Sequence, residues 1–415
     1  YYLKRCNLVK NIIKISLIFL ILFYFFANTY YVNAENSIES AVSLNSEAAI
    51  LIENESGNIL YEKNSSERLY PASTTKIMTA ILAIENCDLN ETAEVSQGAV
   101  DSVPSGYTNA GLIPGEEFTV EELLYALMIA SANEAANVLA EHISGSVEEF
   151  AVLMNEKAKE LGCENTNFVN ANGMHNENHY TTAQDLCTIA EYCFENETFR
   201  EIIQTVNYTV PATELHSAED RILTNTDALI NPNSPYYYEY ALGGKTGFTS
   251  QAGNCLVCFA EKDGIYLTAV LLNASSSVNR FSDARNLLSF GYDNFSNQVL
   301  VPKDTAIETL EISNGEEGAN TVQIVTGEEI TDYVQNNFEN NLSYEITLNE
   351  NILAPVYLGS TLGEITYTLD NKTYTVPLVA GNTVYSAHNY ASYFLAAGLV
   401  LLIISIIIIP KKKKR

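Results

Sequence analysis

The chain has 415 residues, with 51 Asp and Glu against 22 Lys and Arg, and its formal net charge is −29. This length leaves room for two or three domains. The excess of carboxylates argues against nucleic acid or an anionic lipid surface as a partner, because both would repel it.

The first 34 residues have the layout of a secretory signal peptide. Four basic residues precede an apolar run at 15–27, and the small residues up to Ala34 suit a cleavage site. An uncleaved N-terminal anchor is the alternative interpretation. We therefore expect residues 1–34 to direct export of the chain.

Residues 35–296 are predicted to form one α+β domain. Short β-type runs flank segments in which apolar residues recur at helical spacing. The expected strands are 48–53, 59–62, 254–260 and 265–272. The expected helices are 73–84, 147–161, 181–194 and 280–292, together with helical segments within 121–143 on both sides of Ser131.

Residues 297–386 are predicted to form a second, small β-rich domain. Helical spacing gives way there to short β-type runs separated by Asn, Asp and Gly. These runs are 321–325, 342–348, 361–368 and 372–378.

The C-terminal end is predicted to anchor the protein in a membrane. An almost unbroken apolar run at 393–409 is followed by Pro410 and five basic residues. With 390–392 at the interface, this is close to the ~20 residues that a spanning helix needs. An interfacial amphipathic helix is excluded because the run has no polar face. We expect a transmembrane helix at 390–409 and a cytoplasmic tail at 410–415. This topology places the domain at 35–296 on the extracytoplasmic face of the cell membrane.

The charge belongs to this exported body. The two chain ends hold nine of the 22 basic residues and no acidic ones, so the body carries 13 basic against 51 acidic residues, a formal charge of −38. We interpret this as a solvated, self-repelling surface rather than as a sign of the substrate's charge.

Ser73 and Lys76 form an S-x-x-K motif at the expected start of the helix 73–84. A lysine three residues after a serine lies on the same helical face, about one turn away. A partly desolvated lysine beside another cation loses some preference for its charged form and can remove the proton of the serine hydroxyl. The motif is weak alone, since it recurs by chance, and a helix cap with a surface lysine is the alternative.

Two further motifs strengthen this interpretation. Ser131-Ala132-Asn133 lies where one helix is expected to end and another to begin, so that Ser131 can relay a proton and Asn133 can bind a substrate amide. Lys245-Thr246-Gly247 is expected to begin a strand. Its lysine and threonine offer a cation and a hydroxyl to a carboxylate, and its glycine lets a substrate backbone approach for strand addition. Such a set of three motifs is characteristic of penicillin-binding proteins and class A β-lactamases.

The histidines and cysteines predict no metal site. His175 and His179 have i, i+4 spacing, but the Asn and Gly around them indicate a loop rather than a zinc-binding helix. Six cysteines follow the signal, at 87, 163, 187, 193, 255 and 258. Their spacing is irregular, so we interpret them mainly as buried small apolar residues, with some disulfide pairing as the alternative.

The chain resembles the low-molecular-weight penicillin-binding proteins of the D-alanyl-D-alanine carboxypeptidase type, peptidase family S11. The resemblance covers most of the exported body. The segments that carry the resemblance are 71–79 around Ser73, 131–136 beginning at Ser131, 168–185, 244–249 with Ala252-Gly253, Arg280-Phe281, and the β-rich segment ending at 376–379.

The resemblance implies a penicillin-binding, β-lactamase-like transpeptidase domain, followed by the small β-rich domain. It implies that Ser73 is acylated, that Lys76 is the base and that Ser131 relays the proton. It also implies an oxyanion hole made by the backbone N–H groups of Ser73 and Phe248. The substrate-binding residues would be Asn133, Lys245, Thr246, Gly247, Phe248 and Arg280. No cofactor or metal is implied.

The implied substrate is a peptidoglycan stem peptide ending in D-Ala-D-Ala, with β-lactams as covalent inhibitors. Two features depart from the family pattern. Phe248 stands where some members have His, and the segment Asn225-Thr226-Asp227 lacks an arginine that some members carry nearby.

Two alternatives remain open from the sequence. A class A β-lactamase needs a deacylating Glu followed four residues later by Asn, and Glu164 is followed at that distance by Phe168. The added β-rich segment and the anchor also argue against it. A membrane-anchored wall-binding or sensor module without activity is the second alternative, which the intact catalytic motifs disfavour.

Overall fold

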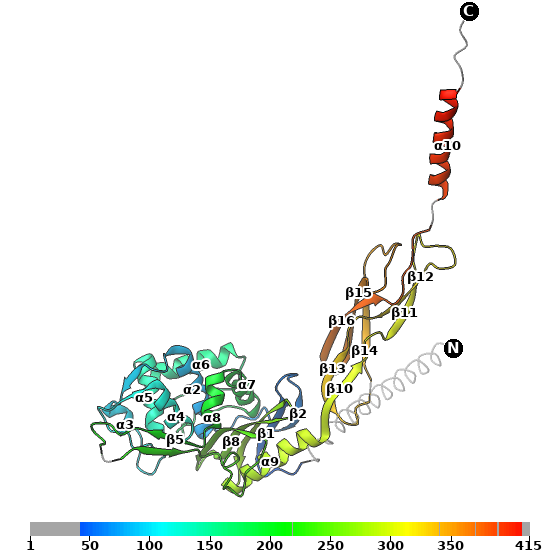
Figure 1. Ribbon diagram of the computed structural model, residues 1–415. Helices are drawn as coiled ribbons and strands as arrows, with labels where there is room; N and C mark the ends of the chain where they lie inside the picture. The colour runs from blue at the N-terminus through cyan, green and yellow to red at the C-terminus, as the bar shows by residue number, and fades with distance from the viewer. Residues whose placement is uncertain (1–41, 218, 340, 370, 388–389, 409–415) are drawn as a thin grey trace, which may run out of the picture. The chain divides into compact units, whose positions relative to one another are not determined.

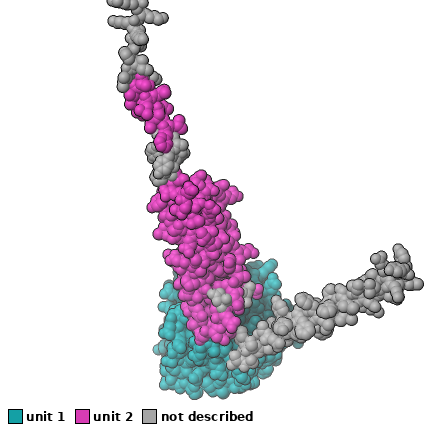
Figure 2. Space-filling model, turned by 90° about the vertical axis from the view of Figure 1, so that its right-hand side faces the viewer, with its two compact units in different colours: residues 1–295 teal, residues 296–415 magenta. Residues whose placement is uncertain are grey.

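The computed structural model describes residues 42–387 and 390–408, apart from 218, 340 and 370. Within these limits the chain forms two compact units, with the boundary between Phe295 and Ser296 (Figures 1 and 2). The predicted signal peptide at 1–34 and the basic tail at 410–415 lie outside the described residues.

The first unit contains a five-stranded antiparallel sheet in the order β2-β1-β9-β8-β7. Its strands are β1 (Ala48–Glu53), β2 (Ile59–Lys63), β7 (Ala241–Thr249), β8 (Gly253–Lys262) and β9 (Ile265–Ala274). The central strands are apolar on both faces, because both faces are covered by helices. On β1, Ile50 joins the core of the helical lobe, whereas Leu51 lies against Gly291 on the other side. Strand β7 lies at the sheet edge.

Helices cover the sheet of this unit on both faces (Figure 1). The central helix α2 has its first eight residues buried, which explains its apolar residues at helical spacing. Around it lie α4 to α8, while α9 packs on β8 and β9. The bounds are η1 (Ala72–Thr75), α2 (Lys76–Asn86), α3 (Gln97–Asp101), α4 (Val120–Met128), α5 (Asn133–Ser144), α6 (Val147–Glu160), α7 (Ala183–Phe194), α8 (Glu197–Gln204) and α9 (Ser277–Asn294).

Two short hairpins complete the first unit. They pair β3 (Thr92–Glu94) with β4 (Glu117–Thr119), and β5 (Asn207–Val210) with β6 (Arg221–Thr224). Long polar loops lead into β4 and β6. The predicted α+β character of this unit is confirmed.

The second unit is β-rich, as predicted, with a core of its own around Val322, Ile324, Ile365 and Leu378. Its main sheet has the order β11-β12-β16-β15-β14, and β10 pairs with β13. The strands are β10 (Phe295–Val301), β11 (Ala306–Glu311), β12 (Thr321–Thr326), β13 (Ile330–Gln335), β14 (Ser343–Leu348), β15 (Thr361–Leu369) and β16 (Lys372–Ala380).

The last element is the helix α10 (Tyr390–Ile408). Judged over the described residues alone, the structure contains no helix that is both long and apolar enough to span a membrane.

The six cysteines of the described chain are all free thiols. Five are buried and Cys87 is half-buried, so they act as small apolar residues of the core. Disulfide pairing among them, the alternative interpretation from the sequence, is not seen in this part of the chain.

Candidate active site

Ser73 and Lys76 meet at the start of α2. The predicted helix was expected to begin at Ser73, but residues 72–75 form a 3₁₀ turn and the α-helix begins at Lys76. The tighter turn still brings residues three apart onto one face. As a result, Lys76 Nζ lies 3.0 Å from Ser73 Oγ.

Lys76 is fully buried and held by two other acceptors. Its Nζ donates to Asn133 Oδ1 at 2.8 Å and to the backbone oxygen of Asn172 at 2.6 Å. Burial, and then the neighbouring Lys245, lower the pKa of Lys76 well below its usual value, while Glu134 opposes the shift. When the amine is neutral, these acceptors hold its two N–H groups, and its lone pair is free to accept the proton of Ser73.

Ser131 and Asn133 come from the junction of two helices, as the sequence predicted. Helix α4 ends at Met128, and Asn133 is the first residue of α5. Asn133 connects two parts of the site, because its Oδ1 accepts from Lys76 while its backbone N–H and its Nδ2 both donate to the oxygen of Thr108. Ser131 is nearly buried and lies in the wall of the pocket.

The backbone is strained at two residues, one next to Ser73 in the chain and one in the pocket wall. Ala72 has φ +49° and Ser131 has φ +60°, a region that residues other than Gly, Asn and Asp rarely adopt. Ala72 is fixed by close packing, since a Cβ atom on Gly173 would come within 1.9 Å of its oxygen. Gly173 therefore cannot carry a side chain without moving the turn that contains Ser73.

Lys245 and Thr246 lie within β7. The strand was expected to begin at Lys245, but it begins at Ala241, because pairing with β8 continues back past the two preceding glycines. Lys245 is fully buried, and burial together with Arg280 lowers its pKa to about 7, with Asp227 opposing. Thr246 Oγ1 lies 2.7 Å from Thr226 Oγ1 at the pocket wall.

Gly247 serves a purpose that the sequence did not predict. A Cβ atom there would lie 2.9 Å from the oxygen of Pro71 and 3.0 Å from the nitrogen of Ser73. The expectation was that this glycine leaves room for a substrate backbone. In the structure, its missing side chain leaves room for the turn that contains Ser73, which packs against β7.

Arg280 reaches the same wall from α9. Its Nη1 donates to the oxygen of Gly247 at 3.1 Å. Asp227 is fully buried, and burial raises its pKa to about 6. A hydrogen bond from the backbone N–H of Leu229 and the charges of Arg280 and Lys245 oppose this shift. Two cations face one buried acid, so this end of the pocket favours an anion.

These residues enclose a pocket with a cavity volume of about 430 Å³. Seven of the nine residues predicted from the sequence line it, and Lys76 and Lys245 lie fully buried beneath them. The lining residues are Ser73, Gly106, Tyr107, Thr108, Ser131, Asn133, Gly173, Met174, Thr226, Thr246, Gly247, Phe248, Thr249, Ser250 and Arg280.

Sequence reasoning missed the wall at 106–108, the Asn172 carbonyl and Thr226. A backbone oxygen leaves no trace in a sequence, and the loop at 106–108 carries no residue of obvious catalytic type. From the sequence, the segment 225–227 was noted only because it lacks an arginine. In the structure, Thr226 contacts Thr246, and the charges of Arg280 and Lys245 act on the carboxylate of Asp227.

None of the described lining residues is an acid, which bears on the β-lactamase alternative. Glu164 is exposed and does not line the pocket. A class A enzyme would need a carboxylate there to activate the deacylating water.

His179 is a structural residue. Its Nδ1 accepts from the backbone N–H of Val169 at 3.1 Å, and its Nε2 lies 2.8 Å from Thr75 Oγ1. Burial, then His175 and Lys76, lower its pKa to about 3, so the ring is neutral at pH 7. Both nitrogens are occupied, which leaves none for the metal considered from the sequence.

Metal-ligating side chains gather at one other place in the described chain. Cys87, Glu91 and His142 each offer one ligand atom, and these atoms lie within 4.8 Å of one another. His142 Nε2 is 3.0 Å from Glu91 Oε1, the geometry of an ion pair. None of the three lines the pocket.

Two family profiles match the chain. The profile for D-alanyl-D-alanine carboxypeptidase, peptidase S11, matches residues 35–276, and that for the C-terminal domain of penicillin-binding protein 5 matches residues 295–386.

Relatives and solved structures agree with these profiles. The D-alanyl-D-alanine carboxypeptidase DacF of Bacillus subtilis is 32% identical over 84% of this chain and 87% of its own length. The crystal structure of the D-alanyl-D-alanine carboxypeptidase DacD from Francisella tularensis superposes with a TM-score of 0.62 at 27% identity, over 83% of this chain and 95% of that one. The DD-transpeptidase of a Streptomyces strain superposes with a TM-score of 0.57 at 32% identity, over 61% of this chain and 98% of that one.

Proposed function

The chain belongs to the peptidase S11 family of D-alanyl-D-alanine carboxypeptidases, and from this premise we propose which of its residues carry out each step. The protein is a serine-type D-Ala-D-Ala carboxypeptidase of peptidoglycan. We assign Ser73 as the nucleophile and Lys76 as its base. The observation that carries this assignment is the 3.0 Å contact between Ser73 Oγ and Lys76 Nζ, in a site where two other acceptors fix the amine.

In acylation, Lys76 Nζ takes the proton from Ser73 as the serine oxygen attacks the carbonyl carbon of the penultimate D-alanine. The backbone N–H groups of Ser73 and Phe248 stabilise the resulting oxyanion. Ser131 passes the proton to the amine of the terminal D-alanine as the peptide bond breaks. The products of this step are free D-alanine and an ester on Ser73.

In deacylation, a water molecule gives a proton to Lys76 and attacks the ester carbon. The bond to Ser73 Oγ then breaks, and the serine regains its proton. A β-lactam also acylates Ser73 in the first step. Its amine then stays attached to the acyl group, because the amide bond that breaks is part of the β-lactam ring. The ester therefore persists as a covalent adduct.

The terminal carboxylate of the substrate is bound by Thr246, Lys245 and Arg280. Thr246 and Arg280 line the pocket, and Lys245 lies buried behind them. The body of the protein is otherwise strongly acidic, so a free carboxylate needs a local cationic site.

A peptide ending in D-Ala-D-Ala is therefore expected to be cleaved far faster than its C-terminal amide. A charge-assisted hydrogen bond contributes roughly 1.5–3 kcal/mol, or about 10- to 150-fold in kcat/KM. Replacing Thr246 by valine should narrow this preference, because it removes one hydroxyl donor and leaves Ser73 in place. Release of D-alanine from the paired peptides, acid and amide, is the measurement.

Penicillin labelling of Thr246→Val tests whether its nucleophile is intact. Equal rates on acid and amide in the wild type would mean that the carboxylate is not recognised. The activity would then be that of a general endopeptidase.

We further propose that the C-terminal segment 390–409 anchors the protein in the cell membrane, with the catalytic unit on the extracytoplasmic face. This rests on the sequence: the run at 393–409 is apolar, and a cluster of five basic residues follows Pro410. The S11 family match supports this proposal, because a carboxypeptidase of peptidoglycan acts at the cell wall.

Truncation of the chain after Ser392 is expected to release a soluble, active protein from the membrane fraction. The reason is that both profile matches end before this point, at 276 and 386. Penicillin labelling of the soluble and membrane fractions measures how much active protein is released, with the full-length chain as control. A truncated protein that stays with the membrane after signal removal would rule out this anchor.

A further inference from the structure

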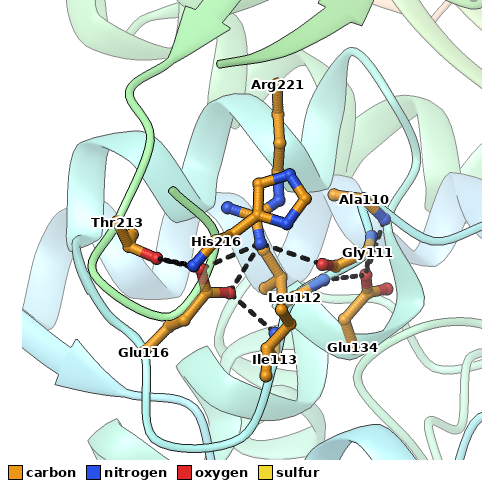
Figure 3. A network of polar contacts seen from close by, with 9 residues as sticks. All are labelled: Ala110, Gly111, Leu112, Ile113, Glu116, Glu134, Thr213, His216 and Arg221. Carbon is orange, nitrogen blue, oxygen red and sulfur yellow. Dashed lines mark hydrogen bonds and ion pairs between the residues drawn. The ribbon is translucent and has the colours of Figure 1, made fainter. Parts of the chain in front are cut away.

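Glu134, the residue after Asn133, is almost fully buried and bonds to the backbone of a distant loop. Its Oε1 accepts from the backbone nitrogens of Ala110, Gly111 and Leu112 at 2.6, 3.0 and 3.5 Å (Figure 3). One carboxylate oxygen thus holds three consecutive N–H groups. Charged acceptors form hydrogen bonds roughly twice as strong as neutral ones.

A buried ion pair holds the same loop from the other side. Arg221 Nη2 donates to the oxygen of Gly111 at 3.0 Å and to Glu116 Oε2 at 2.7 Å (Figure 3). Glu116 Oε2 also accepts from the nitrogen of Ile113 at 2.7 Å. Residues 110–113 are therefore fixed by two carboxylates and a guanidinium.

This fixed segment leads directly into the pocket wall. Gly106, Tyr107 and Thr108 line the pocket. The oxygen of Thr108 accepts both the backbone N–H and the Nδ2 of Asn133. Asn133 Oδ1 in turn accepts from Lys76 Nζ, so a continuous chain of hydrogen bonds links the loop to the base.

We propose that Glu134 is a positioning residue that holds the loop 106–112 against the pocket and thereby fixes Asn133 and the Lys76 amine at Ser73. The Glu116–Arg221 pair clamps the far side of the same loop. This inference rests on the proposed roles of Ser73 and Lys76. It adds a residue that lies outside the pocket lining and acts through Thr108 and Asn133.

The test compares Glu134 with a matched buried carboxylate. Glu53 is also buried and accepts the backbone nitrogens of Glu55 and Ser56 at 3.0 and 2.7 Å, but it holds a hairpin that does not line the pocket. Both residues are changed to glutamine and to alanine. The readouts are the rate of acylation by labelled penicillin, kcat and KM for a D-Ala-D-Ala peptide, and amide hydrogen exchange across residues 104–113.

Glu134→Ala is expected to slow acylation roughly 10- to 100-fold, since a displacement of about 1 Å at a catalytic group costs that much. The loss should appear in kcat as well as in KM, because Lys76 moves. Glu134→Gln should lose less, since its amide oxygen can still accept the three N–H groups, but their amides should exchange faster. The Glu53 variants should lower thermal stability and leave acylation within about twofold of the wild type.

The proposal is overturned if the acylation rate of Glu134→Ala lies within twofold of the wild-type rate. It is also overturned if Glu53→Ala loses as much of its acylation rate as Glu134→Ala does. If Glu134→Ala does not fold, Glu134→Gln decides: unchanged exchange at 110–112 together with unchanged acylation overturns it. Exchange is also measured in a Ser73→Ala background, where no chemistry is needed. Failure of the proposed function, with no D-alanine released by the wild type, is thereby distinguished from failure of the positioning role.

Discussion

Replacing Ser73 by alanine is expected to abolish the covalent penicillin adduct and to slow D-alanine release by roughly 10³-fold or more. Ser73 Oγ lines the pocket and lies 3.0 Å from Lys76 Nζ. Without this hydroxyl no ester forms, and the two-step route through an acyl-enzyme is closed. Intact-mass measurement after penicillin treatment shows the adduct in the wild type and its absence in the variant.

Ser250 supplies the matched control, because it lines the same pocket and is exposed. Ser250→Ala is expected to keep a single adduct of the same mass. An adduct that survives in Ser73→Ala would assign the nucleophile to another residue.

Replacing Lys76 by methionine is expected to have a similarly large effect, on the order of 10³-fold in the rate of acylation. Methionine fills a comparable volume but can neither accept the serine proton nor donate to Asn133 and Asn172. Arginine should fail as well, since its guanidinium stays protonated. Stopped-time labelling with penicillin measures these rates.

The pH dependence of acylation gives the same assignment a second test. Lys76 must be neutral to take the proton, so the rate should rise as pH increases through its pKa. Burial and Lys245 lower that pKa, so the rise should come well below the usual range of a lysine. The control variant is Lys262→Met on β8, because this lysine lies over the ring of Tyr240.

An active Lys76→Arg variant would contradict the role of Lys76 as base.

The local parts of the site could be predicted from the sequence. Ser73 and Lys76 are three residues apart, and any helical turn brings them together. The helix junction at Ser131 was expected because the chain is helical in pattern on both sides of this motif, and the structure places the junction between α4 and α5. The edge position of β7 agrees with a strand that could pair with an extended peptide.

The parts that depend on distant contacts could not be predicted. The carbonyl of Asn172 reaches Lys76 across 96 positions of sequence. The role of Gly247 depends on the nucleophile turn, which lies far away in the chain, and pairing with β8 decides where β7 begins. Such contacts arise from tertiary packing, which periodicity and motif spacing do not encode.

The left-handed backbone at Ala72 and Ser131 lowers the stability of this domain while it holds residues of the site in place. Each such residue costs roughly 1–3 kcal/mol, against a total free energy of unfolding of about 5–15 kcal/mol for a typical domain. Glycine at either position would relieve the strain but make the backbone that holds Ser73 or Ser131 more flexible. Glycine at either position is therefore expected to raise thermal stability and to lower the rate of acylation.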